Sequence, residues 1–472
     1  MKSRKFTIDD LLAFAKLSGD YNPQHVDPVA ARRSLFGSAV AHGIYSVLWG
    51  LDCWLEDINS NIELRSIKAM FPKPIRIGEE VNMLFDSNHH EKHLRIELYS
   101  NRTIASILEI EWAELERRNI DYPEAGFPDK DKPRVLSENE LKTASGTLKL
   151  YLDIETSSKL FPHLSRCLSP LQIAVFLATS RLVGMECPGL HSIYSELKLI
   201  AGDVKNLNTL EYEVKKYDKR FDLISMNIMA PGMTGYIKAF IRPTHQAQAT
   251  YLKLKEIVDK DEFAGQKALI IGGSRGLGEV TAKLLATGAA EVKITYYKGE
   301  EDALRVIKEI TLNGGIAECF HLDVLSNEKN NLSMLLNNWV PTHLYYFATP
   351  FIFSGVKGIF SISLFNRFCD YYITGFLNIV EQLMRLGVRN FFYPSSVAID
   401  ELPLDMGEYA AAKIAGEMLC NFLKASNKDM SIYTPRLPRL STDQTVSILP
   451  VKNQDTIEVM LKHLRLFRDM SI

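Results

Sequence analysis

An aspartate and a histidine stand five positions apart near the start of the chain, in SGDYNPQHVDPVAARRSLFGSAVAHG, residues 18–43. Adding water to an activated double bond requires one group that takes a proton from water and another that protonates carbon, while charge on a carbonyl oxygen is stabilised. Asp20 and His25 suit the first two tasks, and Asn22 could orient them or the water. A helix that begins near Gly43 would offer free N–H groups for the third task. A purely structural turn is the alternative, because Asp, Asn and Pro are common turn residues.

A second group of residues suits nucleotide binding and proton transfer in the last part of the chain. A strand-like run, KALII, leads into a glycine-rich turn that opens a helix, and such turns let the backbone approach a pyrophosphate. The turn comprises Gly272, Gly273, Ser274, Arg275, Gly276, Leu277 and Gly278. Further on, Tyr409 and Lys413 lie one helical turn apart, where the lysine would lower the pKa of the phenol and favour proton transfer.

The elements that would hold the first group are helices and antiparallel strands. Residues 1–130 contain an apolar helix near 44–55, and residues 131–255 repeat this plan with a helix within 160–185. The alternating runs that predict strands are 63–71, 79–87, 93–101 and 106–115, then 191–201, 209–218, 222–231 and 235–243. A Pro- and charge-rich stretch, 124–136, indicates a linker. One helix wrapped by a curved antiparallel sheet is the hot-dog arrangement, so two copies predict an α+β double hot-dog.

The remaining residues, 256–472, change character. Short apolar strands alternate with helices, which predicts an α/β domain with a Rossmann-type doubly wound parallel sheet. The glycine-rich turn would lie at the end of the first of these strands. The chain is therefore expected to contain two hot-dog domains followed by one nucleotide-binding domain.

Composition excludes several classes of protein. The chain has 472 residues and a net charge of -2, without the basic excess typical of nucleic-acid or anionic-membrane partners. Its six cysteines show no C-x-x-C spacing, so neither a metal site nor a disulfide framework is expected. The basic N-terminus is interrupted by Asp9, Asp10 and Lys16, and the longest apolar stretch is too short to span a bilayer. These features predict a cytoplasmic protein without a membrane anchor.

The stretch SGDYNPQH, followed by FGSAVAHG, resembles the MaoC-like (R)-specific enoyl-CoA hydratases. The resemblance covers the family's catalytic loop and the entry to its helix. It implies that Asp20 and His25 are the catalytic pair, that Asn22 supports them, and that a backbone N–H near Gly43 belongs to the oxyanion hole. His42 is interpreted only as a residue that caps or packs at the helix start.

The second hot-dog copy lacks this motif. It has no SGDxNPxH, and its helix lacks the carboxylate found in acyl-carrier-protein dehydratases. His163 is its only plausible base, and a histidine in a surface loop is the favoured interpretation. We therefore expect a non-catalytic copy that completes the sheet and shapes an acyl tunnel.

The G-x-x-x-G-x-G spacing of the glycine turn resembles the short-chain dehydrogenase/reductase family. The Y-x-x-x-K pattern and a serine at the family's spacing before it strengthen the resemblance. It implies that Ser396 holds the substrate carbonyl, Tyr409 transfers the proton and Lys413 binds the cofactor ribose. Tyr372 stands where the family has an asparagine, so the proton relay beyond Lys413 is expected to differ.

The same resemblance bears on the cofactor. Asp323 occupies the place that contacts the adenine, and Ala348 is the residue kept from the family's NNAG segment, which here reads YFAT over 346–349. The second strand ends in TYYKG, without an acidic residue for a ribose 2′-hydroxyl. Arg275 and Lys298 could instead pair with a 2′-phosphate, which favours NADP(H) over NAD(H).

The two expected activities share one compound. A hydratase converts a 2-enoyl thioester into a 3-hydroxyacyl thioester, and a Tyr/Lys reductase interconverts that 3-hydroxyacyl thioester with the 3-ketoacyl thioester. The sequence therefore predicts a bifunctional enzyme acting on acyl thioesters of CoA or acyl carrier protein, and a homodimer is expected. Two alternatives stay open: an enzyme with only one live activity, and a non-enzymatic acyl-binding subunit of a larger synthase.

Overall fold

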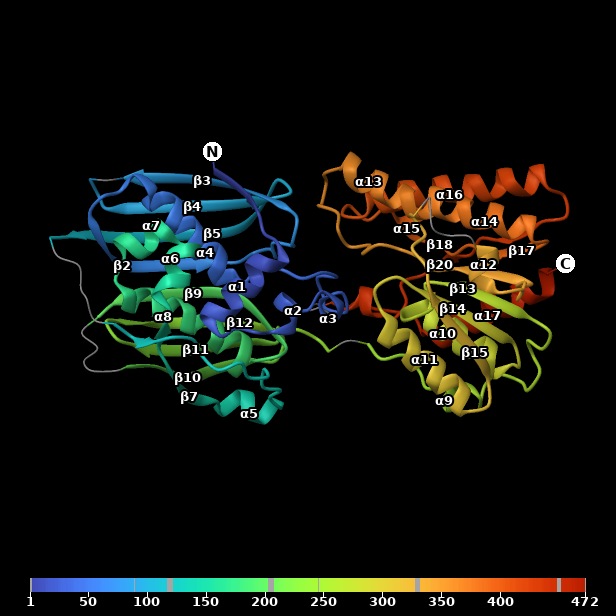
Figure 1. Cartoon of the computed structure of the whole chain (residues 1–472), viewed down its shortest axis with the longest axis horizontal. Coiled ribbons are helices and arrows are strands. Elements are labelled where there is room, and N and C mark those ends of the chain that lie inside the picture. Colours follow the sequence, from blue (N-terminus) through green and yellow to red (C-terminus); the bar gives the residue numbers. More distant parts are fainter. Residues whose placement is uncertain are drawn as a thin grey trace. The chain divides into compact units, whose positions relative to one another are not determined.

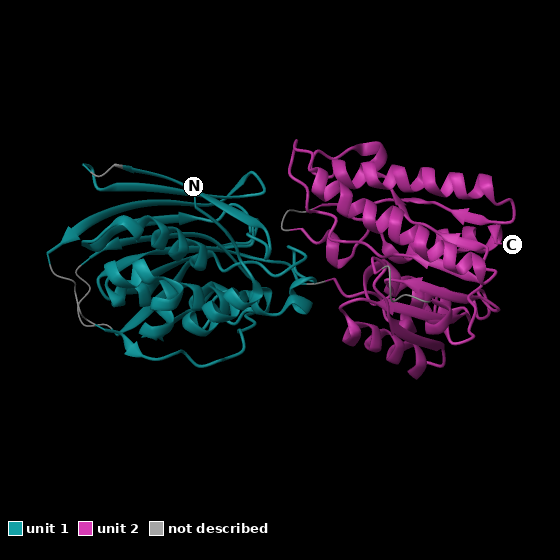
Figure 2. Cartoon of the chain, turned by 45° about the horizontal axis from the view of Figure 1, so that its top comes forward, with its two compact units in different colours: residues 1–244 teal, residues 245–472 magenta. Residues whose placement is uncertain are grey.

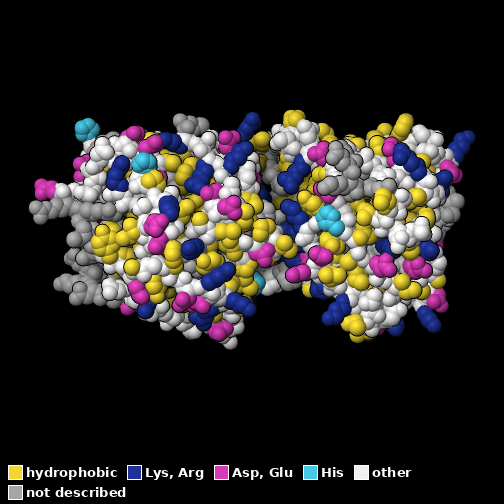
Figure 3. All heavy atoms as spheres, in the orientation of Figure 1, with side chains coloured by type: hydrophobic (Ala, Val, Ile, Leu, Met, Phe, Trp, Pro, Cys, Tyr) yellow, Lys and Arg dark blue, Asp and Glu magenta, His cyan; other side chains and the backbone are white. Residues whose placement is uncertain are grey.

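The computed structural model describes residues 2–88, 90–116, 122–202, 208–244, 246–326, 332–447 and 451–471. The chain forms two compact units, residues 1–244 and residues 245–472 (Figures 1 and 2). Each unit is a mixed α/β structure with its own sheet. Basic and acidic side chains are interspersed on the face drawn in Figure 3.

The first unit is built on one ten-stranded antiparallel sheet, in the order β1-β3-β4-β5-β2-β9-β12-β11-β10-β7. The first half contributes β1 (Lys2–Lys5), β2 (Asn61–Met70), β3 (Glu80–Asn88), β4 (His93–Ser100) and β5 (Thr103–Leu115). The second half contributes β7 (Ser145–Lys149), β9 (Ser192–Ala201), β10 (Thr209–Asp218), β11 (Leu223–Ala230) and β12 (Met233–Ile241). The halves join where β2 pairs with β9. All eight strands predicted from alternating runs are confirmed.

Helices cover one face of this curved sheet (Figure 1). The two long apolar helices are α4 (Gly43–Trp54) and α8 (Pro170–Arg181), and both are buried on nearly all sides, as expected for helices that are apolar all round. The others are α1 (Ile8–Ser18), α2 (Pro23–Val26), α3 (Pro28–Ala31), α5 (Glu138–Thr143), α6 (Ile154–Leu160), α7 (Pro162–Cys167), η1 (Leu55–Asp57) and η2 (Leu182–Glu186). One continuous hydrophobic core runs through both halves.

The second unit is built on a six-stranded parallel sheet in the order β15-β14-β13-β16-β17-β19. Its strands are β13 (Lys267–Ile271), β14 (Glu291–Tyr296), β15 (Ile316–His321), β16 (His343–Tyr346), β17 (Asn390–Phe392) and β19 (Ser431–Tyr433). Counted along the chain, this is the order 3-2-1-4-5-6, which is typical of dinucleotide-binding sheets.

Both faces of the parallel sheet are covered. On β13, Ala268 and Ile270 join one hydrophobic core while Leu269 and Ile271 join another, because side chains alternate along a strand. The first core includes α9 (Tyr251–Leu254), α10 (Gly276–Thr287), α11 (Glu300–Leu312) and α17 (Thr456–Met470). The second includes α12 (Leu332–Leu336), α13 (Ile362–Cys369), η3 (Asp370–Gly375), α14 (Phe376–Arg385) and α16 (Gly407–Ser426).

The boundary between the two compact units lies at residue 244, eleven residues before the expected one at 255. The stretch 124–136 is part of the first unit, where Arg134 N donates to the carbonyl of Met185 and Arg134 O accepts from Leu190 N. Residues 245–255, expected in the second hot-dog copy, belong with the parallel sheet. The hydroxyl of Tyr251 donates to the carbonyl of Ala286 at 3.1 Å, and the helix around it packs into that core.

Within the described ranges, no helix combines the length and the apolar character that crossing a bilayer would require.

Candidate active sites

The loop that carries Asp20 is held by the way α1 ends. Gly19 ends the helix with φ of 78°, and a Cβ there would lie 2.8 Å from Arg181 Cδ, so a larger residue would be strained and crowded. Asp20 follows with 3% of its surface exposed. The side-chain oxygen of Asn22 then accepts from Gln24 N at 3.1 Å and caps α2.

Asn22 ties this loop to the second half of the unit. Its amide Nδ2 lies 3.0 Å from the carbonyl oxygen of Gly184 and 3.2 Å from those of Gly189 and Leu190. Because the amide and the oxygen of Asn22 both bond to backbone groups, this residue holds the loop rather than orienting a water. The motif loop is therefore fixed by residues about 165 positions further along the chain.

The Asp20 carboxylate is buried and also contacts the second half. Ser180, on α8, donates to Oδ2 at 2.7 Å, while Asn22 N donates to Oδ1 at 3.3 Å. Gly184 makes room for the carboxylate, since a Cβ there would lie 2.0 Å from Oδ1. Burial raises the pKa of Asp20, and the charge of His25 and the hydrogen bond from Ser180 act in the opposite direction.

His25 is arranged as a neutral base. Its Nδ1 lies 2.7 Å from the carbonyl oxygen of Val40, and because a carbonyl can only accept, Nδ1 carries the proton and Nε2 keeps its lone pair. Burial lowers the pKa of His25, while the Asp20 carboxylate raises it. A neutral imidazole with a free Nε2 can take a proton from water at neutral pH.

His42 is the residue of this site whose role the sequence did not reveal. It precedes α4 without capping it, and its ring stacks on His25 with centroids 3.9 Å apart. Nε2 donates to the backbone carbonyl of Asp20 at 3.0 Å, whereas Nδ1 is buried without a partner among the described residues.

Gly43 is the first residue of α4, directly after His42. The first N–H groups of a helix have no partner within it and favour negative charge. A Cβ on Gly43 would lie 3.1 Å from the ring of Phe71, so glycine leaves space at this helix start. The helix end therefore lies next to the His25–His42 pair, as an anion-stabilising group requires.

Ser180 offers a direct test of the contact between the halves. Ser180→Ala removes the donor to Asp20, so the pKa of Asp20 should rise further and thioester hydration should fall by about tenfold. The pH profile of kcat/KM, measured with Ser157→Ala as the control, checks this because the buried Ser157 hydroxyl contacts Ser165 instead. Equal pH profiles for both variants and the wild type would contradict a positioning role.

His163 has a structural place in the second copy. The backbone N–H groups of His163 and Leu164 both donate to Asp52 Oδ1 at 2.8 Å, so a carboxylate on α4 caps the start of α7.

The cluster of potential proton-transfer groups contains Asp20, His25 and His42 within 4.8 Å of one another. The second half thus reaches the site through Ser180 and the loop after α8, a contribution that sequence reasoning missed.

In the second unit, the glycine turn has the shape that close approach to a phosphate needs. Gly272 and Gly276 have φ of 79° and 58°, which favour glycine. A Cβ on Gly278 would lie 2.3 Å from the carbonyl oxygen of Gly272, so a side chain would force the turn open. Ala348 lies beside the turn, since a Cβ on Gly272 would lie 3.0 Å from its nitrogen. The remaining turn residues, Gly273, Ser274 and Leu277, complete the connection from β13 to α10.

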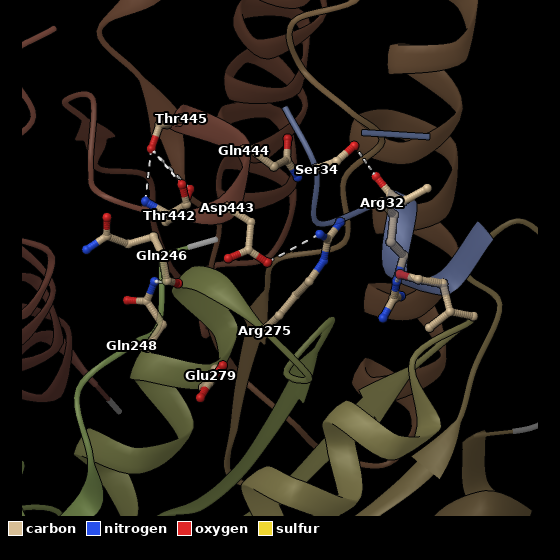
Figure 4. Close-up of polar contacts among 12 residues, drawn as sticks. Arg32, Ser34, Gln246, Gln248, Arg275, Glu279, Thr442, Asp443, Gln444 and Thr445 are labelled. Carbon is tan, nitrogen blue, oxygen red and sulfur yellow. Dashed lines mark hydrogen bonds and ion pairs between the residues drawn. The ribbon is translucent and has the colours of Figure 1, made fainter. Parts of the chain in front are cut away.

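The residues expected to select the cofactor lie in different surroundings. Arg275 Nη1 lies 3.5 Å from Asp443 Oδ2, as Figure 4 shows, so the guanidinium already faces a carboxylate. Lys298 is exposed, with its Nζ 5.4 Å from the ring centroid of Tyr297. Asp323 Oδ1 accepts from Leu325 N at 3.0 Å after β15. A 2′-phosphate at Arg275 would have to compete with Asp443.

Ser396, Tyr409 and Lys413 lie near one another in the second unit. Ser396 ends β18 (Ser395–Ser396), and a hydrogen bond from its hydroxyl lowers the pKa of the Tyr409 phenol. Tyr409 and Lys413 are both buried on the same face of α16, 8% and 6% exposed. Lys413 Nζ lies 5.9 Å from the ring centroid of Tyr409, whereas Ser396 is partly exposed.

The pKa of the Tyr409 phenol is raised, not lowered, in its buried surroundings. Burial raises the pKa of Tyr409 to about 12, and only the hydrogen bond from Ser396 lowers it. Lys413 Nζ lies 3.9 Å from the ring centroid of Tyr372 and donates to the carbonyl of Pro394 at 2.7 Å. Burial also lowers the pKa of Lys413 to about 7, which reduces its charge at neutral pH.

Tyr372 and Thr349, both singled out in the sequence, contact each other. Their hydroxyls lie 2.6 Å apart, and Tyr372 sits in the π-helical turn η3. The phenol of Tyr372 therefore already has a hydrogen-bond partner in Thr349. π-Turns of this kind are frequent at functional sites.

The titration of Lys413 predicts a pH-dependent stability of the second unit. Its pKa is near 7 in the folded chain and 10.5 ordinarily, so the unfolded chain binds more protons between these values and stability rises with pH. Lys413→Met should remove this rise, on the order of 1–3 kcal/mol between pH 7 and 9.5. Urea unfolding of both proteins at the two pH values measures it. The prediction would be contradicted if the free energies of unfolding of the wild type and the variant differed by the same amount at both pH values.

Comparisons with known proteins match the N-terminal part of the chain. Residues 1–105 match the family described as MaoC like domain, so the chain begins with a MaoC-like domain. Protein MaoC of Klebsiella aerogenes is 32% identical over 84 residues, which cover 17% of this chain and 24% of that protein. The mitochondrial 3-hydroxyacyl-[acyl-carrier-protein] dehydratase of Arabidopsis thaliana is 28% identical over 81 residues, which cover 17% of this chain and 41% of that protein. The chain thus spans less than half the length of these two relatives.

Solved structures resemble part of the chain. A 3-oxoacyl-[acyl-carrier protein] reductase from Brucella melitensis is 20% identical, covers 48% of this chain and 91% of its own, and has a TM-score of 0.39. A short-chain dehydrogenase/reductase from Serratia marcescens is 16% identical and has a TM-score of 0.39. The match covers 43% of this chain and 91% of the reductase chain.

Proposed function

We propose that the chain is a bifunctional enzyme of 3-hydroxyacyl thioester metabolism. The first unit would be an (R)-specific enoyl-thioester hydratase/dehydratase, and the second an NADP(H)-dependent 3-ketoacyl-thioester reductase. The observation that carries the proposal is the pairing of buried Asp20 with a His25 whose Nε2 is left basic. The gathering of Ser396, Tyr409 and Lys413 supports the second activity.

We interpret the first unit as a double hot-dog and the second as a doubly wound Rossmann domain. Two long buried helices on one ten-stranded antiparallel sheet support the first assignment. The strand order 3-2-1-4-5-6 and a separate core on each sheet face support the second. The proposed domains are residues 1–130, 131–244 and 245–472.

In the hydration step, His25 Nε2 takes a proton from water while the water oxygen bonds to C3 of the enoyl thioester. Asp20, whose pKa is raised by burial, would give its proton to C2, and the proton that His25 took from water would then restore Asp20. The N–H groups at the start of α4, near Gly43, stabilise the charge that develops on the thioester oxygen. The reverse sequence of steps is dehydration.

In the reduction step, a bound nicotinamide cofactor would supply hydride to the substrate carbonyl. The glycine turn at Gly272, Gly276 and Gly278 would hold its pyrophosphate, since side chains at Gly272 and Gly278 would crowd the backbone there. Asp323 and Ala348 would contact the rest of the cofactor. Arg275 and Lys298 would select the 2′-phosphate of NADP(H). Tyr409 gives a proton to the carbonyl oxygen, which Ser396 holds, and Lys413 binds the ribose.

Placing both activities on one chain would raise the local concentration of the shared hydroxyacyl thioester. The name of the Arabidopsis thaliana relative, a 3-hydroxyacyl-[acyl-carrier-protein] dehydratase, supports an acyl thioester as the substrate class. A cofactor of the NADP(H) type would favour reduction followed by dehydration.

One observation favours the alternative of a single live activity. Lys413 donates to Pro394 O and lies over Tyr372, so it is held by the protein rather than left for a ribose. On this alternative the hydratase works and the reductase does not.

Two assays with the purified full chain test the proposal. Hydration of a short 2-enoyl-CoA is followed at the enoyl thioester absorbance, and oxidation of NADPH or NADH is followed with a 3-ketoacyl-CoA. Turnover in both assays supports bifunctionality, and turnover in one supports the single-activity enzyme. Turnover in neither, with CoA and carrier-protein thioesters alike, would favour an acyl-binding subunit. Light scattering tests the expected homodimer.

A further inference from the structure

Arg242 is a cation placed beside the proposed hydratase site. It directly follows β12, and its Nη2 donates to the carbonyl of Leu190 at 2.6 Å. The same carbonyl accepts from the amide of Asn22 at 3.2 Å, so the guanidinium and the catalytic loop share one acceptor. The charge of Arg242 acts on His25 and lowers the pKa of that imidazole. Arg242 therefore lies within electrostatic reach of the reacting groups.

Within the described part of the chain, this guanidinium has no counter-charge. Its Nε is enclosed without a hydrogen-bond acceptor, and no carboxylate acts on its pKa. Burial lowers the pKa of Arg242 to about 10, so the group stays charged at neutral pH. The Nε–H is thus a donor that the described residues leave without an acceptor.

Arg181, in the same unit, shows what a balanced half-buried arginine looks like. Burial lowers its pKa as well, but the carboxylates of Glu186, Asp131 and Asp129 act against that effect. Its Nη2 also donates to a backbone carbonyl, that of Lys149. The difference between the two arginines is the missing anion at Arg242.

An enclosed charge without a partner destabilises a protein unless something else supplies the opposite charge. We propose that Arg242 binds an anionic group of the thioester substrate, a carboxylate or a phosphate, next to His25. The inference deepens the proposed hydratase function and rests on it. A planar guanidinium with free N–H groups suits two oxygens of either anion.

The anion has two possible sources. A carboxylate would be part of the acyl chain, and Arg242 would then select acyl groups that carry one. A phosphate would belong to CoA or phosphopantetheine, and Arg242 would then bind the carrier arm whatever the acyl group. The two sources can be distinguished because a phosphate and an acyl carboxylate can be included in, or left out of, synthetic thioester substrates separately.

Arg242→Gln, compared with wild type on three substrates, distinguishes them. The substrates are crotonyl-CoA, crotonyl-N-acetylcysteamine, which has no phosphate, and a 2-enoyl-CoA with a terminal carboxylate. A phosphate contact should raise KM at least about tenfold for both CoA thioesters and leave the N-acetylcysteamine thioester unchanged. A carboxylate contact should raise KM only for the carboxylated acyl group. In both cases kcat should change little.

Arg220→Gln is the matched control, because Arg220 is exposed and pairs with Asp218 in a turn of the same unit. Arg242→Lys keeps the charge but not the two parallel N–H donors of the guanidinium. Its KM should therefore lie between the values of wild type and Arg242→Gln. Unchanged KM for all three substrates would overturn the proposal. An equal fall in kcat for all three would overturn it as well, since that result indicates a structural role.

Binding measurements separate this inference from the proposed activity. Calorimetry of the same thioesters with Asp20→Asn, with and without Arg242→Gln, requires no turnover. Weaker binding of only the anion-bearing thioesters supports the inference even if hydration is never seen. Equal binding to both proteins contradicts it, whatever the activity of the wild type.

Discussion

Asp20→Asn should lower kcat for enoyl-thioester hydration by roughly 1,000-fold while leaving NADPH-dependent reduction unchanged. The substitution keeps the shape of a side chain that is 3% exposed and can still accept from Ser180, so the loop should stay folded. It removes the only carboxylate in the cluster with His25 and His42, and with it one of the two proton-transfer groups. Steady-state hydration of a short 2-enoyl-CoA measures the effect.

Asp52→Asn is the control for this prediction. Asp52 is also a buried acid of the first unit, but its Oδ1 accepts from the backbone at the start of α7. Its replacement should lower stability more than activity. A loss of hydration that is equal in both variants would show that burial of a carboxylate matters rather than its place beside His25.

Tyr409→Phe should lower the rate of ketoacyl reduction by at least about 1,000-fold and leave hydration unchanged. The ring of Tyr409 packs edge-on against Phe368 and Tyr372, with centroids 5.7 and 5.8 Å away, and phenylalanine keeps both contacts. The loss is therefore the hydroxyl, which gives the proton to the substrate oxygen. NADPH oxidation with a 3-ketoacyl-CoA measures it.

Tyr251→Phe is the control in the same unit, since the buried Tyr251 hydroxyl donates to Ala286 O in the other core of the sheet. If Tyr409→Phe kept most of the wild-type rate, the proton would come from another group. Tyr372, joined to Thr349 at 2.6 Å and facing Lys413, would be the next candidate.

Much of the architecture could be predicted from local sequence. Strict alternation in stretches such as 223–230 predicts a strand with one buried face, and its inward residues Ile224, Met226 and Ile228 are indeed buried. The glycine turn was predictable because Gly272, Gly276 and Gly278 leave few other backbone shapes. Asp20, His25 and the Ser396 group could be proposed for a related reason, since each proposal depends on spacing within a short motif.

What could not be predicted depends on contacts between distant parts of the chain. The hydrogen bond from Ser180 to Asp20 joins positions 160 residues apart, and no local pattern marks it. The low pKa of Lys413 arises because Tyr372, Tyr393 and Tyr409 surround it, and two of these lie outside its helix. The boundary at 244 was missed because α9 joins the second unit through packing and through hydrogen bonds from Tyr251 to Ala286 and Glu309, which no local pattern marks.

The amide of Asn22, which reaches the carbonyl oxygens of Gly184, Gly189 and Leu190, makes the first half of the unit depend on the second. Asp20 depends on the second half as well, through the hydroxyl of Ser180. A chain shortened to the first half would lose these anchors, so its Asp20 loop would no longer be held in place.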